Sequence, residues 1–263
     1  MNPLLKWPGG KRRLVATIRE HFPEQFGRYF EPLCGGSALF FSLEAANATL
    51  SDANAELIRC YQAVAEQPED IIDILSCIPN THEEYYKIRA WQPDNTVQRA
   101  AKMLYLCRLS FNGIYRVNLR GEYNVPYGKK THLTSCDPDL IRCASDLLRT
   151  VDFLHGDFAL ALETAQPGDL VYLDPPYTVA HSQNGFIKYN QTLFSWADQQ
   201  RLAILAEELR LRGCHVLVSN AEHHSTRDLY LTFETVEITR HSIISASSAG
   251  RKQVTELLFV GRP

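Results

Sequence analysis

Several familiar signatures are missing from this chain of 263 residues, and each absence removes a class of protein. No apolar run approaches the length that crosses a bilayer, and no secretory apolar core precedes the charges of residues 1–11. The segment Lys6–Lys11 lacks the G-x-x-x-x-G-K-[ST] spacing of a P-loop, and no G-x-G-x-x-G dinucleotide pattern occurs. We therefore expect a soluble, cytoplasmic protein and disfavour a dehydrogenase or a P-loop enzyme.

The cysteines also lack the spacing of a zinc site or a disulfide framework. No two of the seven form a C-x-x-C pair, and their number is odd. They are Cys34, Cys60, Cys77, Cys107, Cys136, Cys143 and Cys214. We expect free thiols in a reducing compartment and no metal.

Apolar residues are plentiful, at 45% of the chain, which is enough for one sizeable core and an additional subdomain. The net charge of −3 does not decide whether the partner is nucleic acid, but the segment 99–130 is locally basic. Its basic residues are Arg99, Lys102, Arg108, Arg116, Arg120, Lys129 and Lys130, against the single acid Glu122. Charge alone leaves a DNA-binding face and an ordinary solvated face equally open.

Strand-like and helix-like stretches alternate at both ends of the chain, which predicts an α/β fold with a mostly parallel sheet. The predicted strands are 29–31, 49–50, 151–154, 168–173 and 214–219, with helices at 38–46 and 197–212 and a turn at Gly213. At the end of the chain, 233–244 and 254–260 predict an antiparallel hairpin joined by a Ser/Gly-containing loop.

The middle of the chain interrupts this alternation. It contains helical patterns at 58–65, 71–78 and 97–109, then a polar, aromatic stretch with turns at Arg120-Gly121 and Tyr127-Gly128. We interpret 56–148 as a helical domain with a hairpin at about 112–128, inserted into a domain formed by 1–55 and 149–263.

The segment Asp174-Pro175-Pro176-Tyr177 directly follows the apolar strand predicted at 168–173, where α/β sheets bind ligands. Two prolines stiffen the backbone and donate no N–H, so their carbonyls remain acceptors. Asp174 and the Pro175 carbonyl would accept the two hydrogens of an amine such as the 6-amino group of adenine, while Tyr177 offers a stacking face. The alternative is an ordinary Pro-Pro turn, but the position after a strand favours function.

Two further segments have the form of a nucleoside site. Glu31-Pro32-Leu33-Cys34-Gly35-Gly36-Ser37 is a glycine turn between a strand and a helix, and Asp52 follows the next strand, where an acid binds ribose hydroxyls. Near the start, Trp7 lies between Lys6 and Lys11 before a Gly-Gly turn. By itself the Gly35-Gly36 segment is more often an ordinary tight turn, and a loosely packed terminal arm explains the Trp7 segment at least as well.

Taken together, these segments resemble the Dam-type, adenine-N6-specific DNA methyltransferases from about residue 5 to about residue 260. Six motifs occur in that family's order: Lys6-Trp7-Pro8-Gly9-Gly10-Lys11; Glu31-Pro32 with its glycine turn; Ser51-Asp52-Ala53-Asn54; Asn118-Leu119-Arg120-Gly121-Glu122-Tyr123-Asn124-Val125-Pro126-Tyr127-Gly128; Asp174-Pro175-Pro176-Tyr177; and Val218-Ser219-Asn220. Any one would be weak, but the ordered set is specific.

The resemblance implies a class I S-adenosylmethionine-dependent methyltransferase fold, with 56–148 as an inserted target-recognition domain. It also implies a monomer that acts on double-stranded DNA without a metal. The residues at family cofactor positions are Trp7, Lys11, Glu31, Gly35, Asp52 and Asp174, and the catalytic segment is Asp174, Pro175, Pro176 and Tyr177.

By the same resemblance, the segment 108–130 reads DNA, with GATC or a related short site as target. Phe111 would insert into the base stack, Lys6, Ile114 and Arg116 would contact bases, and Asn112 and Lys129 would contact the backbone. Arginine to guanine is also the commonest specific contact in the major groove. The adenine would be flipped over Tyr177, and 178–190 would form a closing loop.

The glycine turn departs from the family at two positions. Leu33 stands where Phe is usual, and Ser37 replaces a second glycine. We expect Ser37 to impose an ordinary backbone conformation and to weaken or rearrange cofactor binding.

Two other functions remain open. One is a methyltransferase acting on RNA, on the 4-amino group of cytosine or on a protein amide, although families for those tasks tend to carry Ser or Asn at the position of Asp174. The other is a non-catalytic DNA-binding module with this fold. The biological role, in restriction–modification, in replication and repair, or in a phage or mobile element, also stays open.

Overall fold

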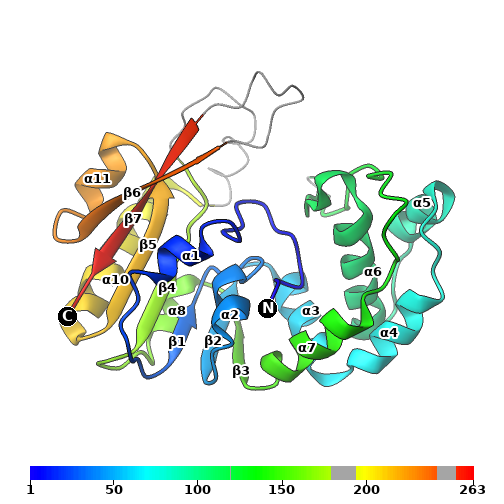
Figure 1. Cartoon of the computed structure of the whole chain (residues 1–263), viewed down its shortest axis with the longest axis horizontal. Coiled ribbons are helices and arrows are strands. Elements are labelled where there is room, and N and C mark those ends of the chain that lie inside the picture. Colours follow the sequence, from blue (N-terminus) through cyan, green and yellow to red (C-terminus); the bar gives the residue numbers. More distant parts are fainter. Residues whose placement is uncertain (119, 179–193, 242–252) are drawn as a thin grey trace. The chain divides into compact units, whose positions relative to one another are not determined.

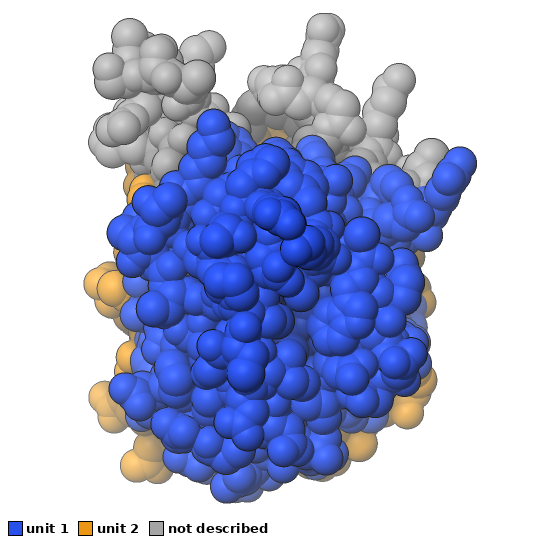
Figure 2. Space-filling view, turned by 90° about the vertical axis from the view of Figure 1, so that its right-hand side faces the viewer, with its two compact units in different colours: residues 1–12, 34–157 blue, residues 13–33, 158–263 orange. Residues whose placement is uncertain are grey.

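The computed structural model describes residues 1–118, 120–178, 194–241 and 253–263. The chain forms two compact units, coloured separately in Figure 2. Unit 1 contains Met1–Arg12 and Cys34–Asp157, and unit 2 contains Arg13–Leu33 and Phe158–Pro263. Within the described ranges, no helix combines the length and apolar character that a membrane span requires.

The described residues of unit 2 form five strands, in the spatial order β1-β4-β5-β7-β6 (Figure 1). They are β1 (Tyr29–Glu31), β4 (Leu170–Leu173), β5 (His215–Ala221), β6 (Glu234–His241) and β7 (Gln253–Gly261). The pairs β1–β4 and β4–β5 are parallel, whereas β7 is antiparallel to both β5 and β6. The predicted parallel strands and the antiparallel hairpin are therefore confirmed; the Ser/Gly loop of that hairpin lies outside the described residues.

The helices in the described part of unit 2 are α1 (Val15–Arg19), α8 (Phe158–Leu162), α10 (Trp196–Arg212) and α11 (His224–Leu229). The helix predicted at 197–212 is confirmed as α10, and its caps set its boundaries. Ser195 and Asp198 form a capping box at its start, and Gly213 ends it with a φ of 103°. The helix buries Leu202, Ala206 and Leu209 in a core shared with β4 and β5.

Unit 1 pairs β2 (Ala48–Asp52) and β3 (Val151–His155) in parallel, beside α2 (Ala38–Leu43). Its other helices are α3 (Ala55–Glu66), α4 (Pro68–Ser76), α5 (His82–Ala90), α6 (Thr96–Leu109), the 3₁₀ turn η1 (Phe111–Gly113) and α7 (Pro138–Leu148). Helix α3 packs on both α6 and α7, and α4 packs on α6. The predictions of α3, α4 and α6 are confirmed.

Helices α5 and α7 were not among the predicted patterns, although each has a start signal. The Thr81 hydroxyl accepts from the Glu84 N–H, and Asp137 accepts from the Leu140 N–H ahead of Pro138. All of 56–148 falls inside unit 1, together with β2, β3 and the first twelve residues. Its separate identity as a recognition domain stays a prediction.

Candidate functional site

The carboxyl ends of β1, β4 and β5 bring polar residues to one edge of the sheet in unit 2. Asp174 directly follows β4, as predicted, and is half-buried. Because β1 runs parallel to β4, Glu31 ends its strand at the same edge, where its buried carboxylate accepts a hydrogen bond of 3.0 Å from the Tyr29 hydroxyl. Asn220, on the parallel neighbour β5, is fully buried at that edge. This is the sheet edge at which α/β proteins bind ligands.

A hydrogen-bonded chain fixes the backbone after Asp174. The Gln199 side-chain N–H donates to the Pro176 carbonyl at 3.0 Å, and the Asn220 amide donates to Gln199 Oε1 at 3.0 Å. Gln199 and Asn220 are both fully buried. The carbonyl of Pro175, by contrast, accepts no hydrogen bond from any part of the chain that the structure describes. Among the described contacts of the tetrapeptide, the Pro176 carbonyl is therefore occupied and the Pro175 carbonyl is not.

The ring of Tyr177 is also held. Its hydroxyl donates to Glu256 Oε2 at 2.8 Å, and Glu256 is buried on β7. A hydroxyl that is anchored at its tip fixes the long axis of the ring, which suits a stacking surface.

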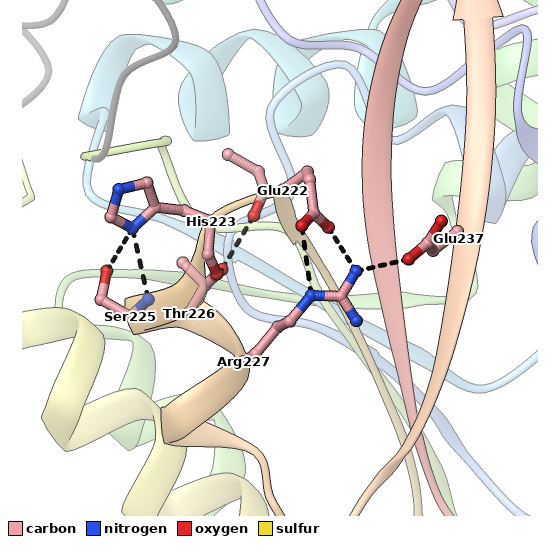
Figure 3. Close-up of polar contacts among 7 residues, drawn as sticks. Glu222, His223, Ser225, Thr226, Arg227 and Glu237 are labelled. Carbon is pink, nitrogen blue, oxygen red and sulfur yellow. Dashed lines mark hydrogen bonds and ion pairs between the residues drawn. The ribbon is translucent and has the colours of Figure 1, made fainter.

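Ion pairs hold the chain that follows β5 (Figure 3). Arg227 forms ion pairs with Glu222 at 2.7 Å and with Glu237 on β6 at 2.5 Å. The Thr226 hydroxyl donates to the Ala221 carbonyl at 2.8 Å. These contacts tie α11 to β5 and β6, directly beyond the residue that supports Gln199.

In unit 1, the glycine turn is tied to the end of β2. The Gly35 N–H donates to Asp52 Oδ2 at 3.0 Å, the Asn54 N–H donates to Asp52 Oδ1 at 2.8 Å, and the Tyr61 hydroxyl donates to the Gly35 carbonyl at 2.8 Å. Burial raises the pKa of Asp52, and the two backbone donors oppose that shift. Asp52 ends β2, as the sequence indicated.

The expected ordinary conformation of Ser37 is wrong. Ser37 lies in the left-handed region, at φ 45° and ψ 44°, in spite of its Cβ. Its N–H donates to the Cys34 carbonyl at 2.7 Å, and its hydroxyl reaches the same oxygen at 3.4 Å. These bonds hold the buried turn in a conformation that usually requires glycine. Leu33, the other departure, packs against the core of unit 2.

Trp7 lies against the glycine turn. A Cβ placed on Gly35, whose φ is +46°, would be 2.8 Å from Trp7 Cδ1, and one on Gly36 would be 3.1 Å from Trp7 Cβ. The turn must therefore be glycine for the indole to approach this closely. Lys11 is buried, and its ammonium donates to the Gly9 carbonyl at 3.0 Å.

The predicted hairpin begins at a bridge between Ser110 and Tyr127 and narrows at a second bridge between Val117 and Tyr123. The tip residue 119 lies outside the described residues, but Gly121 has the expected turn conformation, with φ +77°. Of the residues assigned to DNA contact, Phe111 is 56% exposed, Asn112, Arg116 and Lys129 are exposed, and Ile114 is half-buried. Lys6 is exposed in the N-terminal arm, and its side chain lies against Gly113.

The basic residues of the segment 99–130 have different kinds of partner in the structure. Lys102 donates to the Trp91 carbonyl, and Arg99 pairs with Glu56 at 3.4 Å, so these two cations serve the helical packing. Lys130 donates to the Arg108 carbonyl at 2.8 Å. Burial, together with the charges of Lys6 and Arg108, lowers the pKa of Lys130 to about 8.

Three residues that sequence reasoning did not assign support the tetrapeptide or the hairpin. Gln199 carries no motif, and only its position in the first turn of α10 brings it to Pro176. Glu256 is an isolated acid in an apolar strand, which is a usable signal because a buried acid needs a partner. Asn80 accepts from the Tyr127 hydroxyl at 2.7 Å and donates to the carbonyls of Lys130 and Leu133, which anchors the chain after the hairpin.

Comparison with known proteins is consistent along the whole chain. The family model of the D12 class N6 adenine-specific DNA methyltransferases matches residues 7–243. The type II methyltransferase M1.LlaDCHI of Lactococcus lactis subsp. cremoris is 36% identical over 268 residues, which covers 98% of this chain and 94% of the relative. The type II methyltransferase M.MjaIII of Methanocaldococcus jannaschii is 32% identical, with 99% of each chain covered.

The DNA adenine methylase of Serratia marcescens is 33% identical over 265 residues, with 98% of this chain and 97% of the relative covered. Among solved structures, the glycopeptide N-methyltransferase MtfA aligns over 98% of this chain and 78% of its own, at a TM-score of 0.33 and 12% identity, a similarity too weak to support a conclusion. The full-length sequence matches confirm the family that the ordered motifs indicated. The chain belongs to the D12 class of N6 adenine-specific DNA methyltransferases.

Proposed function

We propose that this protein transfers the methyl group of S-adenosylmethionine to the 6-amino group of an adenine in duplex DNA, within GATC or a related short site. The observation that carries the proposal is the difference between the two proline carbonyls after β4. The carbonyl of Pro176 is occupied by Gln199, whereas the carbonyl of Pro175, next to Asp174, accepts no hydrogen bond from the described chain. A carboxylate beside an available carbonyl matches the two hydrogens of an amine.

The proposed chemistry needs little from the protein except positioning. The lone pair of the 6-amino group is delocalised into the adenine ring, so the amine is a weak nucleophile. Acceptance of its hydrogens by Asp174 and the Pro175 carbonyl favours the pyramidal form, in which the lone pair is available. Tyr177, held by Glu256, provides the face on which the flipped base stacks. No covalent enzyme intermediate is required.

The residues assigned to the methyl donor fit a nucleoside. Gly35 lies close to the Trp7 indole, and Asp52 uses its two oxygens for two backbone donors while a carboxylate offers about four acceptor sites. Capacity remains for ribose hydroxyls. When bound, S-adenosylmethionine supplies an electrophilic methyl on a sulfonium. We assign it to Trp7, Lys11, Glu31, Gly35, Asp52 and Asp174, with no metal.

We assign DNA recognition to 56–148 as an inserted domain, together with Lys6 of the N-terminal arm. Arg116 and Ile114 reach base edges, and the 56%-exposed Phe111 inserts into the base stack. Asn112 and Lys129, exposed on the same segment, contact phosphates. The proposed loop 178–190 lies, beyond Thr178, outside the described residues. We further propose that the protein acts as a monomer in the cytoplasm.

The test is expression of the full chain in cells that lack adenine methylation, followed by single-molecule sequencing of their DNA. We expect N6-methyladenine at one short motif, GATC or a close relative. Modified cytosine, or modification of RNA alone, would instead support an enzyme for another amine. Unmodified nucleic acid, with the purified chain still binding DNA, would support a non-catalytic module.

A further inference from the structure

Tyr115 lies between Ile114 and Arg116, the two hairpin residues assigned to base edges, and it stacks on Trp7. The ring centroids are 4.6 Å apart and the planes differ by 13°. Both rings are half-buried. The attraction between two rings stacked in this way exceeds the contribution of their buried area alone, so each ring restricts the position of the other.

On the side that we assign to the methyl donor, the glycine turn restricts the position of the Trp7 indole. Its Cδ1 edge lies so close to Gly35 that a Cβ there would be at 2.8 Å, and Gly35 is itself bound by Asp52 and Tyr61. Tyr115 covers one face of the indole. A ligand that contacts Trp7 must therefore fit an indole whose orientation is set from two directions, by the glycine turn and by the hairpin.

On the side of DNA, Tyr115 is linked to the backbone that presents Ile114. The Tyr115 ring meets Tyr123 edge-on at 5.8 Å, and the Tyr123 hydroxyl donates to the Ile114 carbonyl at 2.8 Å. Lys6, the residue before Trp7, lies against Gly113 in the same hairpin. Thus a continuous series of contacts joins Asp52 and the glycine turn to the residues that read bases, all within unit 1.

We propose that Tyr115 is a positioning residue that couples binding of the methyl donor at Trp7 to recognition of DNA by the hairpin. The inference rests on the proposed function. A ligand at the glycine turn removes the freedom that remains to the indole of Trp7, and through the stack it restricts Tyr115 as well. The hairpin then loses less conformational entropy when it binds its site. Coupling of this kind is reciprocal, so cognate DNA must tighten donor binding by the same factor.

The test compares binding, not turnover. Fluorescence anisotropy gives the Kd of a GATC-containing duplex with and without saturating S-adenosylhomocysteine, the demethylated product, which cannot react. The wild type should bind the duplex more tightly with the nucleoside present. Removal of the stack in Tyr115→Ala should reduce this ratio by about 3-fold to 10-fold, the range expected for one aromatic pair. Tyr115→Phe, which keeps the ring, should retain the ratio.

Matched variants separate coupling from general damage. Tyr86→Ala removes a tyrosine of α5 that contacts His82 and Arg89 and should leave the ratio unchanged. Tyr115→Leu keeps an apolar side chain without a ring and serves if the alanine variant does not fold. An undiminished ratio in a folded Tyr115→Ala or Tyr115→Leu overturns the coupling role, even if the wild type methylates DNA. Failure of the wild type to bind S-adenosylhomocysteine or to methylate overturns the proposed function, and this inference with it.

Discussion

At the scale of single residues, hydrogen bonds distinguish two neighbouring prolines that look equivalent in the sequence. Pro176 and Pro175 both present a carbonyl without an N–H of their own, but Gln199 binds only the first. Gln199 is in turn bound by Asn220. The polar support of the tetrapeptide therefore comes from two buried amides on α10 and β5, and that support fixes the acceptor next to Asp174.

Replacement of Gln199 by Leu should disturb both stability and catalysis. The change leaves the buried Asn220 Nδ2 group and the Pro176 carbonyl without the partner that Gln199 provides, which costs about 2 kcal/mol in the free energy of unfolding. Displacement of the tetrapeptide should lower kcat by about 10-fold to 100-fold. Denaturant unfolding and methyl-transfer kinetics measure the two effects. The control is Gln200→Leu, the exposed neighbour, and equal behaviour of the two variants would refute the supporting role of Gln199.

Ser37 offers a test of backbone strain. At φ 45°, Ala is as strained as Ser, whereas Gly is not. We expect the Ser37→Gly variant to have a free energy of unfolding about 1 kcal/mol higher than that of Ser37→Ala. Chemical denaturation of the two variants measures the difference directly. A more stable alanine variant would mean that the left-handed conformation is not maintained in solution.

Arg116 should determine sequence preference more than affinity. Arg116 Nε donates a hydrogen bond to Asn124 Oδ1 at 2.7 Å, and this bond holds one edge of the guanidinium group. Replacement by Ala should cost about 1–3 kcal/mol at one base pair of the site and relax discrimination there. Competition between duplexes that differ at single positions measures this. Equal weakening for every duplex would instead identify Arg116 as a phosphate contact.

At the scale of elements, the strands and the longer helices could be predicted because their patterns are local. β4 is an apolar run between turn residues, and α10 has both a capping box and a terminal glycine. Helix α5 has only a short polar sequence with a weak apolar face and was missed. The conformation of Ser37 could not be predicted, since it depends on the Cys34 carbonyl and on the packing of the turn.

For the candidate site, the sequence could predict the motif residues but not the residues that support them. The ordered motifs located Asp174 and Asp52 at the ends of strands and Trp7 in the N-terminal arm. Their partners come from distant parts of the chain: Glu256 follows Tyr177 by 79 residues. An isolated acid such as Glu256 signals that it needs a partner, but the sequence does not say which one, so these pairings emerge only from the fold.

Because of Lys130, which follows the hairpin, we predict that the affinity for DNA depends on pH. The pKa of Lys130 is lowered to about 8, chiefly by burial and then by Lys6 and Arg108, so the free protein loses this proton as the pH rises. A nearby phosphate stabilises the ammonium, so above pH 8 the complex holds more protons than the free protein. Affinity for duplex DNA should therefore fall by about 10-fold between pH 7 and pH 9.

Anisotropy titrations of Lys130→Met provide the control for this effect. Without the ammonium, binding should already be weaker at pH 7, and the fall between pH 7 and pH 9 should be smaller than in the wild type. If the wild type and the variant show the same pH dependence, Lys130 does not face a phosphate in the complex.

At the scale of the whole molecule, charge and family membership carry different information. The net charge of −3 gives no sign of a polyanionic substrate, although we assign a group of cations around the hairpin to DNA; Arg99 and Lys102 instead bind within the helical part of the chain. Family membership covers the chain almost completely and establishes adenine-specific DNA methylation as the shared chemistry. The catalytic assignment for this chain then depends on one carboxylate.

The most direct measurement is transfer of tritiated methyl from S-adenosylmethionine to adenine in duplex DNA by the wild type and by Asp174→Ala, with N6-methyladenine identified after digestion. We expect the wild type to form N6-methyladenine and Asp174→Ala to form none above background, while the variant retains wild-type affinity for the duplex. Asp228→Ala, on α11, should remain active. Undiminished methyl transfer by Asp174→Ala would contradict the assignment of this carboxylate as the group that holds the adenine amine.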